Sequence, residues 1–201
     1  MLTAVIRHPA PMRPLGVGAI VTAACALIVS VAVAAPSEKV VLADRAADVG
    51  GPLDLTRASL QRASDGRLRA VVTFAGKVTP KMLLARSGPP GSACLRIHTA
   101  SAADPRSMRP DRLVCVTARS ETQLRGGVYE VSGSQLPRRL ARASVRRNSS
   151  GRSIVIRFSQ SSLGRPRRIR FGIESTRPGC ERPSCIDSVP DKGATLPFRL
   201  R

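Results

Sequence analysis

A run of arginines with no carboxylate among them is the part of this sequence with the most evident chemistry. Between Val131 and Ile173 there are eleven arginines and no Asp or Glu. Guanidinium groups present N–H donors in a planar fork that matches the oxygens of phosphates and carboxylates. This segment therefore predicts an anion-binding surface. The alternative is that these arginines are solvated and reflect a composition that favours Arg over Lys.

Two stretches inside this segment indicate how some of the arginines are presented. Residues 153–160 and 167–175 both alternate apolar and polar residues, with the stretch Ser-Ser-Leu-Gly-Arg-Pro between them, so we predict two strands joined as a hairpin. With the apolar residues facing inward, the intervening arginines would share one outward face. Like charges opposed across a ladder destabilise it, and a bound anion would relieve the repulsion. The predicted binding residues are Arg157, Arg168 and Arg170 on the hairpin, with Arg142 and Arg146 before it.

Aspartates gather near both ends of the predicted domain. If the first and last strands lie close together, their oxygens could converge on Ca²⁺, which prefers such hard ligands. The alternative is that these side chains cap turns through hydrogen bonds to the backbone. The candidate calcium ligands are Asp44, Asp48, Asp54, Asp187 and Asp191. No other cofactor is expected.

Four cysteines follow the N-terminal apolar segment, and four cysteines allow three pairings. Cys94 and Cys115 each lie in an alternating apolar run, so they can form a bridge if those strands are neighbours. Cys180 and Cys185 would then close the short loop Cys-Glu-Arg-Pro-Ser-Cys. A zinc ion held by four thiolates is the alternative, although the spacing lacks the paired Cys-x-x-Cys units typical of such sites.

Residues suited to catalysis are few. His98 is the only histidine after the N-terminal segment, so any Ser-His-Asp or Cys-His arrangement would have to use it. Paired carboxylates could hydrolyse glycosidic bonds without histidine, but their arrangement in space cannot be derived from the sequence. A hydrolase or lyase acting on polysaccharide or cell wall is thus the alternative to a binding function.

Alternation at period two recurs along the chain and sets the expected fold. Residues 51–76 fit either a helix followed by a strand or two strands joined at Ser-Asp-Gly, and the turn signal favours a hairpin. Residues 139–148 are ambiguous between helix and strand, and the Asn-Ser-Ser-Gly turn after them favours a strand. These patterns predict an all-β, antiparallel, jelly-roll-like β-sandwich. Further strands are expected at 93–99, 112–118, 127–132 and 195–200.

Three segments carry a resemblance to a known kind of domain. They are residues 42–74, the stretch Leu-Gly-Arg-Pro-Arg-Arg-Ile-Arg-Phe-Gly-Ile-Glu-Ser-Thr at 163–176, and the closing Asp-Ser-Val-Pro-Asp-Lys-Gly-Ala-Thr-Leu-Pro-Phe at 187–198. In these the chain resembles secreted actinobacterial proteins of unknown function whose fold is similar to the DOMON and family-nine carbohydrate-binding sandwiches. The resemblance implies a sandwich fold. The sugar-binding relatives stack aromatic rings on sugars, and this chain departs from them because it has no Trp and one Tyr, so we expect no stacking platform.

The N-terminus resembles an export signal. Arg7 and Arg13 precede an uncharged stretch from Leu15 to Ala35 that ends in small residues, which predicts a signal peptide over residues 1–34. Because that stretch also has roughly the length that spans a bilayer, an uncleaved membrane anchor is the alternative. Residues 35–201 are predicted to form a single domain, secreted or held in the cell envelope, where exported cysteines pair.

Charge then defines the expected function. Of 33 basic residues, cleavage removes two, which leaves 31 against 13 acidic residues and a net charge of +18. We expect a non-catalytic, exported binding or structural module whose basic face contacts an anionic cell-envelope polymer or an acidic protein. Nucleic acid would bind only through weak, salt-sensitive electrostatics, so no specific nucleic-acid partner is expected, and membrane contact only through an uncleaved leader.

Overall fold

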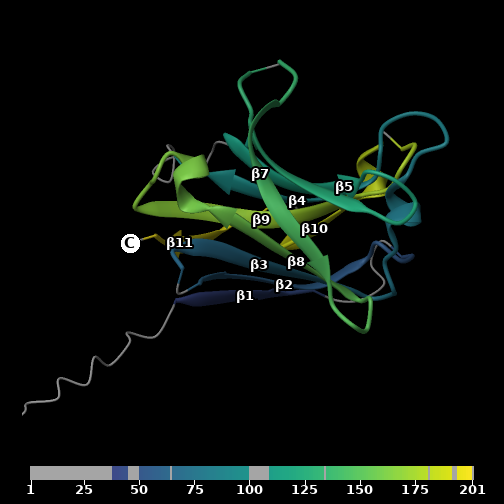
Figure 1. The fold of residues 1–201 in the computed structure, drawn as a ribbon, viewed down its shortest axis with the longest axis horizontal. Coiled ribbons are helices and arrows are strands. Elements are labelled where there is room, and N and C mark those ends of the chain that lie inside the picture. Colours follow the sequence, from purple (N-terminus) through teal and green to yellow (C-terminus); the bar gives the residue numbers. More distant parts are fainter. Residues whose placement is uncertain are drawn as a thin grey trace, which may run out of the picture. The chain divides into compact units, whose positions relative to one another are not determined.

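The structure of the protein is a computed structural model (Figure 1). It describes residues 38–44, 50–63, 65–99, 109–133, 135–180, 182–191 and 194–200. All of these belong to one compact unit, Pro36–Arg201. The predicted leader lies outside the described residues and stays a prediction.

Strands account for nearly all the regular structure that the described residues form. No α-helix occurs among them, and accordingly none has the length and apolar character needed to cross a membrane. Three short 3₁₀ turns interrupt the strands: η1 (Pro80–Leu83), η2 (Gln160–Leu163) and η3 (Pro183–Cys185). The strands are β1 (Lys39–Ala43), β2 (Leu55–Arg62), β3 (Arg67–Phe74), β4 (Ser92–His98), β5 (Arg112–Ala118), β6 (Leu124–Glu130), β7 (Arg138–Arg147), β8 (Ser153–Ser159), β9 (Arg168–Thr176), β10 (Ile186–Val189) and β11 (Leu196–Arg199).

The strands form two antiparallel sheets that share β7. Strand order along the path is β1-β2-β3-β8-β7-β6-β5-β4-β9-β10, with β11 pairing to β9. The first half of β7 pairs with β6, and Ser144–Arg147 pairs with β8. We call β1-β2-β3-β8 with the second half of β7 sheet A, and the remaining strands sheet B. The all-β antiparallel sandwich predicted from the sequence is confirmed.

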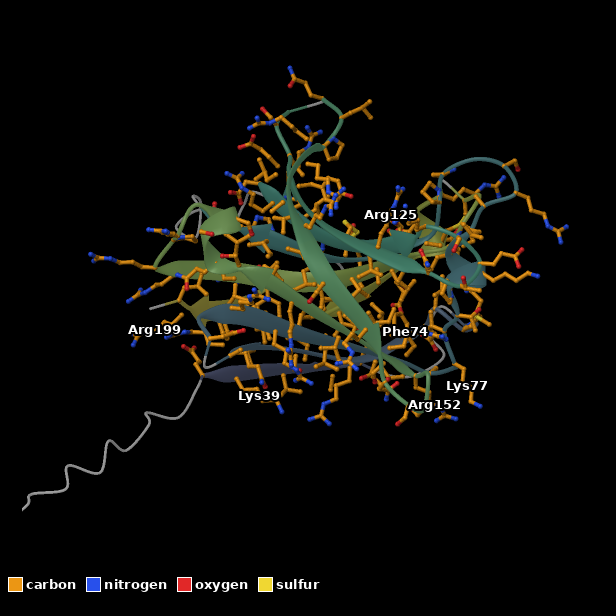
Figure 2. All side chains as sticks on the ribbon, in the orientation of Figure 1. Lys39, Phe74, Lys77, Arg125, Arg152 and Arg199 are labelled. Carbon is orange, nitrogen blue, oxygen red and sulfur yellow. A yellow bond between two sulfur atoms is a disulfide. The ribbon has the colours of Figure 1, made fainter. Side chains whose placement is uncertain are left out.

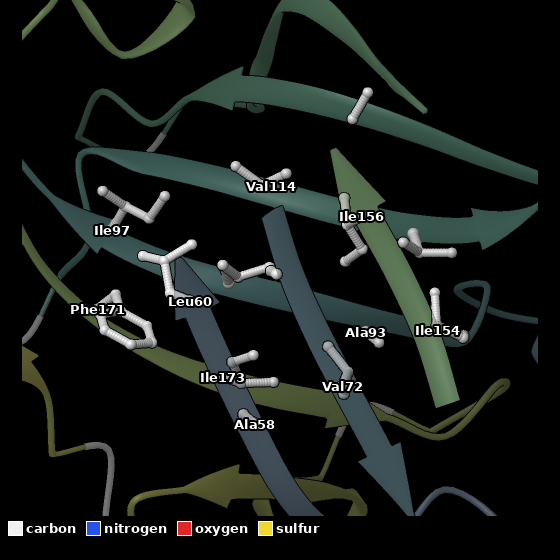
Figure 3. Close-up of a cluster of buried hydrophobic side chains, with 14 of the residues drawn as sticks. Ala58, Leu60, Val72, Ala93, Ile97, Val114, Ile154, Ile156, Phe171 and Ile173 are labelled. Atoms are coloured by element: carbon white, nitrogen blue, oxygen red, sulfur yellow. The ribbon is translucent and has the colours of Figure 1, made fainter. Parts of the chain in front are cut away.

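The core lies between the two sheets (Figure 3). Alternating residues of each strand point into it, as in β3, where Leu68, Ala70, Val72 and Phe74 are all buried and their neighbours are not. Strand β8 does the same with Ile154, Ile156 and Phe158. Burial of apolar side chains contributes roughly 1.5–3 kcal/mol for each large residue, so this alternation is what fixes which face of each strand is inside.

The ambiguous stretch 51–76 is a hairpin, as predicted. Strands β2 and β3 pair from Leu55–Phe74 to Arg62–Leu68. The turn between them closes with a hydrogen bond from the amide of Ala63 to the carbonyl of Arg67, and Gly66 has a positive φ of 74°. Glycine adopts that conformation without a steric penalty, which is why the Ser-Asp-Gly signal identified the turn correctly. Residues 139–148 are also a strand, β7.

The hairpin predicted from residues 153–160 and 167–175 is wrong. Both strands exist, but β8 pairs with β3 and β7 in sheet A, while β9 pairs with β4, β10 and β11 in sheet B. The connection crosses from one sheet to the other, and Leu163 of η2 is buried in it. Alternation shows which face of a strand is buried, and this is the same for two strands that pair and for two that face each other across a core.

Two short strands were not predicted. Strand β1 pairs with β2, and β10 pairs with β9. Each has at most five residues, too few for alternation to be recognised above chance. Both lie at the ends of the strand path.

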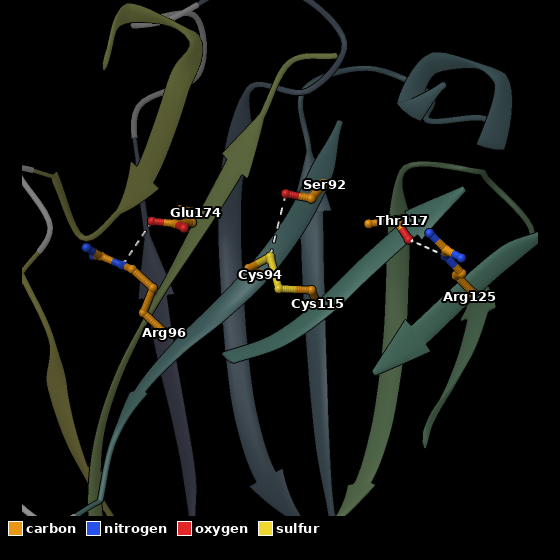
Figure 4. The surroundings of a disulfide bond; sticks show 7 residues. All are labelled: Ser92, Cys94, Arg96, Cys115, Thr117, Arg125 and Glu174. Atoms are coloured by element: carbon orange, nitrogen blue, oxygen red, sulfur yellow. Dashed lines mark hydrogen bonds and ion pairs between the residues drawn. A yellow bond between two sulfur atoms is a disulfide. The ribbon is translucent and has the colours of Figure 1, made fainter. Parts of the chain in front are cut away.

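Both predicted disulfides are confirmed. Cys94 and Cys115 lie directly opposite each other on β4 and β5, with Cα atoms 4.1 Å apart (Figure 4). Cys180 and Cys185 close the short loop before β10, with Cα atoms 6.0 Å apart. With all four sulfurs in disulfides, no thiolate is left for the zinc alternative. Disulfides persist in oxidising compartments, so the two bridges indicate such an environment.

Candidate anion-binding surface

Long cationic side chains project from the domain in many directions (Figure 2). Lys39, Lys77, Arg152 and Arg199 all extend away from the strands. Several other cations are matched by carboxylates in ion pairs. These pairs are Arg67–Asp65, Lys81–Glu121, Arg96–Glu174, Arg112 with Asp111 and Glu130, and Arg138–Glu130. A candidate anion site is therefore a place where arginines gather without such partners.

The outer face of sheet A carries a row of side chains with no carboxylate. Ladder pairing places Lys39, Gln61, Arg69, Arg157 and Ser144 directly opposite one another across five strands. We call this set the cationic row. Arg69 and Arg157 are immediate cross-strand neighbours, and side chains in that relation have Cβ atoms about 4.5–5.5 Å apart. Two arginine side chains therefore start from adjacent positions on the outer face of sheet A.

A groove lies along the end of this row. Arg69, Arg146 and Arg157 line it together with Ser144 and Val155, and its volume is about 340 Å³. We call it the sheet-A groove. Its remaining lining residues are Arg147, Asn148 and Ser149, so no carboxylate borders it. The side chains of Arg69, Arg146 and Arg157 make no hydrogen bond or ion pair with any part of the chain that the structure describes.

The turn after β7 fixes one end of the groove. The side-chain oxygen of Asn148 accepts a hydrogen bond from the amide of Ser153 at 3.0 Å, and its amide nitrogen donates to Ser150 at 2.7 Å. Arg147 reaches away from the other arginines to donate to the carbonyl of Val78 at 3.3 Å. The wall is therefore held by the protein, while the three arginines in front of it remain available to a ligand.

The structure brings together only part of the predicted arginine set. Arg146 and Arg157 meet in the sheet-A groove. Arg168 and Arg170 lie on β9 in sheet B, so the single face predicted for them and Arg157 is wrong. The reason is the mistaken hairpin, because the outer faces of the two sheets point away from each other. Arg142 lies on the half of β7 that pairs with β6.

Arg170 has a structural partner. Its Nε donates to the Thr195 hydroxyl at 3.0 Å and its Nη2 donates to the Thr195 carbonyl at 2.8 Å. These bonds tie β9 to the segment before β11. Arg168 is exposed and lies opposite Arg199 on β11.

Arg69 was missed by sequence reasoning. Its outward position was readable from the alternation of β3, but nothing in the sequence indicated that β3 and β8 are neighbours. Arg69 and Arg157 are 88 positions apart in the sequence, and only the ladder between β3 and β8 makes them adjacent. The identity of the groove therefore depends on a non-local pairing.

The predicted calcium ligands come only partly together. Asp187 accepts a hydrogen bond from the amide of Leu55, next to Asp54, and both aspartates are 2% exposed. The amide of Asp44 donates to the carbonyl of Thr56 at 3.0 Å. Asp191 is exposed after β10, and Asp48 lies outside the described residues. No three His, Cys, Asp or Glu side chains in the described ranges are grouped as a metal site requires, so calcium gains no support from them.

Instead, the buried aspartates belong to a contact between the sheets. Asp187 on β10 bonds to the start of β2, and the hydroxyl of Ser175 on β9 donates to the carbonyl of Leu53 at 2.6 Å. Both bonds join sheet B to sheet A at the side away from β7. Since a buried backbone donor or acceptor without a partner costs roughly 1–3 kcal/mol, these contacts help to hold the sandwich together.

His98, the histidine on which a Ser-His-Asp or Cys-His arrangement would depend, is buried, and so are the carboxylates of Asp54 and Asp187. His98 is 5% exposed, and burial lowers its pKa, with Arg96 and Arg170 acting in the same direction against the opposing effect of Asp111. No observation in the described residues favours the hydrolase or lyase alternative over a binding function.

A half-buried ion pair lies beside the Cys94–Cys115 disulfide (Figure 4). Arg96 Nε is 3.4 Å from a carboxylate oxygen of Glu174, and their side chains are 12% and 25% exposed. Burial raises the pKa of Glu174, and Arg96 only partly offsets this effect. The pair is thus a structural feature of sheet B, distant in the ladder from the cationic row.

Comparison of this chain with protein families, with curated proteins and with solved structures finds no match.

Proposed function

We propose that this protein is an exported, non-catalytic β-sandwich that binds an anionic polymer of the cell envelope through the sheet-A groove and the cationic row. The observation that carries the proposal is the convergence of Arg69, Arg146 and Arg157 on one groove without a carboxylate. The two disulfides and the predicted leader support export. The resemblance to carbohydrate-binding sandwiches supports a binding role, with charge in place of aromatic stacking.

The arrangement of charges favours an extended ligand over a single small ion. The cationic row crosses five strands, and neighbouring strands are about 4.8 Å apart. Lys39 at one end and Arg157 near the other are therefore separated by roughly 14 Å. A linear polymer with repeated phosphate or carboxylate groups can contact both ends at once. An acidic protein segment is the second ligand of this kind that the row would accept.

Binding would also remove an unfavourable interaction within the free protein. Arg69 and Arg157 repel each other across the ladder, and like charges in that relation are destabilising. An anion between them converts the repulsion into two charge-assisted contacts. Part of the affinity therefore arises from relief of repulsion, and it decreases with salt.

The test is retention of the exported chain on immobilised poly(glycerol phosphate) and on polygalacturonate. In the test variant Arg69, Arg146 and Arg157 are changed to Glu. In the control variant three arginines of the β9–β11 region, Arg167, Arg168 and Arg199, are changed to Glu. Each variant changes three arginines to Glu, so the two variants have the same net charge, and all three control residues are exposed.

We expect the test variant to lose at least about tenfold in affinity, the equivalent of roughly one charge-assisted hydrogen bond. The control variant should stay close to the parent. Retention of the parent should fall steeply between about 0.1 M and about 1 M salt, where the Debye length falls from about 10 Å to about 3 Å. Equal losses in the two variants would show that net charge alone is responsible, and would refute the proposed site.

A further inference from the structure

A second arginine-lined groove lies where β7 leaves β6. Ladder pairing between these strands ends at Gly126–Ala143, and from Ser144 onward β7 pairs with β8. The two strands diverge beyond that point, and a groove of about 400 Å³ opens between them. We call it the β6–β7 split. Its rim is formed by Arg119, Arg125, Arg139 and Arg142.

A bulge in β7 brings two of these arginines to the same side. Residues three apart in a regular strand point to opposite faces. Here, however, Arg139 lies opposite Tyr129 and Arg142 lies opposite Gly127, because the register shifts by one residue between them. Tyr129 and Gly127 are two apart and share a face. Bulges re-aim side chains in this way and are frequent beside functional sites.

Hydrogen bonds hold two of the four guanidinium groups in place. Arg125 Nε donates to the Thr117 hydroxyl at 2.9 Å (Figure 4). Arg139 Nη2 donates to the carbonyl of Gly126 at 3.1 Å. The side chains of Arg119 and Arg142 make no hydrogen bond or ion pair with any residue that the structure describes. Two oriented cations and two available ones thus surround the opening.

The inner part of the split is apolar. Leu124, Ala143 and Val145 line it between the arginines. Gly126 allows the strands to come this close, since a Cβ atom there would lie 2.6 Å from both the Ala143 carbonyl oxygen and a Val145 methyl group. The groove therefore combines a cationic rim with an apolar interior of limited volume.

We propose that the β6–β7 split is a binding site for a phosphate monoester that carries an apolar substituent. A phosphate monoester has close to two negative charges above about pH 7, and four guanidinium groups with planar donor forks match its oxygens. The apolar substituent lies against Leu124 and Val145. The split and the sheet-A groove have no arginine in common, so this site does not depend on the proposed polymer binding.

The chain contains its own reporter for this site. It has one tyrosine and no tryptophan, so Tyr129 is the only strongly fluorescent side chain. Its ring lies against Gly127, within 2.7 Å of where a Cβ atom would be, on the face that Arg139 and Arg142 share. A ligand in the split should change the emission of Tyr129. A ligand in the sheet-A groove should not.

The experiment is a titration of the folded, disulfide-bonded chain with hexyl phosphate, inorganic phosphate and hexyl sulfate at about pH 7.5, where the monoester is largely dianionic. We expect saturable binding of hexyl phosphate at least about tenfold tighter than that of inorganic phosphate, which corresponds to burying about two CH₂ groups. Hexyl sulfate, with one charge, should bind more weakly than hexyl phosphate. Equal affinity for hexyl phosphate and inorganic phosphate would overturn the apolar part of the proposal.

Variants separate this site from the one on sheet A. Arg119→Gln with Arg142→Gln removes two side chains that make no bond to the described residues, so the fold should be kept, and hexyl phosphate should bind at least about tenfold more weakly. The matched control is Arg167→Gln with Arg168→Gln, which should bind as the parent does. If both pairs of substitutions leave the affinity within about twofold, the proposal is wrong.

The source of the phosphate is tested in the same assay. A Tyr129 response to soluble hexyl phosphate supports a small phosphorylated ligand, and a response only to phosphatidylcholine vesicles that contain phosphatidic acid supports a lipid headgroup. No response to either overturns the site. In each case the variant that carries Arg69→Glu, Arg146→Glu and Arg157→Glu should respond like the parent. The result for the β6–β7 split therefore does not depend on whether the sheet-A groove binds a polymer.

Discussion

Reversing the charge of Arg157 should stabilise the protein while weakening its binding to polyanions. Arg157 lies directly opposite Arg69 on the outer face of sheet A, with no carboxylate near the pair. Cross-strand charge pairs contribute about 0.2–1 kcal/mol, unfavourably for like charges and favourably for opposite ones. Arg157→Glu replaces a pair of like charges with a pair of opposite charges, which should raise the free energy of unfolding by about 0.5–2 kcal/mol. For a domain of this size, in which 1 kcal/mol shifts Tm by about 2–4 °C, the increase in Tm would be about 1–8 °C.

Calorimetry of the disulfide-bonded chain at low salt, repeated in about 1 M salt, measures this effect. The gain should largely disappear at high salt, where the Debye length of about 3 Å is shorter than the separation of the two side chains. Arg168→Glu is the control, because Arg168 faces Arg199 on β9 and β11 in the same relation. Arg168→Glu should stabilise by less, because Glu38 already lies beside Arg199, and polymer binding should be unchanged. A Tm for Arg157→Glu at low salt that is equal to or below that of the parent would refute the reasoning about the cationic row.

Three further predictions concern the stability of sheet B. In urea unfolding, Gly126→Ala should destabilise the protein by about 1–3 kcal/mol, because the new Cβ atom would lie against the main chain of β7. Gly127→Ala should destabilise it by less, because its Cβ atom would meet only the ring of Tyr129, which can rotate. A larger loss for Gly127→Ala than for Gly126→Ala would contradict this geometry. Replacing Cys94 and Cys115 by Ala should lower the free energy of unfolding by about 3 kcal/mol, and removing the Cys180–Cys185 bridge should lower it by about 2 kcal/mol. The difference is expected because the bridged residues are 21 and 5 positions apart. Equal urea midpoints for the two variants would argue against this dependence on loop length. Burial lowers the pKa of His98 in the folded protein, so as the pH falls below about 6.5 this histidine is protonated in the unfolded chain before it is protonated in the folded one. The free energy of unfolding should therefore decline from about pH 6.5 down to the lowered pKa. Thermal melts of His98→Gln should lack this part of the decline, and a pH profile equal to that of the parent would disprove the prediction.

The half-buried Arg96–Glu174 ion pair of sheet B has a desolvation cost that a fully exposed pair would not have. Desolvation raises the pKa of Glu174 even though Arg96 lies 3.4 Å away. The attraction therefore does not fully offset the loss of hydration, as is common for enclosed pairs. Removing one partner would leave the other buried without its counter-charge, whereas replacing both with apolar residues need not destabilise the domain.

The sandwich class, the two disulfides and most of the strands could be predicted because each depends on local pattern. Strand β3 shows its buried face in eight residues, and the glycine of the β2–β3 turn identifies a hairpin within a few residues. Cys94 and Cys115 belong to two recognisable strands 21 residues apart. Side-chain periodicity and turn chemistry are short-range properties, so the sequence records them directly.

The candidate sites could not be predicted in the same way. Arg69 and Arg157 are neighbours only because β3 pairs with β8, and Arg139 joins Arg142 only because β7 bulges between them. The sequence alone determined that the chain is basic, that its cysteines can pair, and that it forms strands in which apolar and polar residues alternate. Which arginines face one another was decided by strand pairing, register and the crossing of β7 between sheets. Those features depend on the packing free energy of contacts between residues that are distant in the sequence, and no single stretch of sequence determines that free energy.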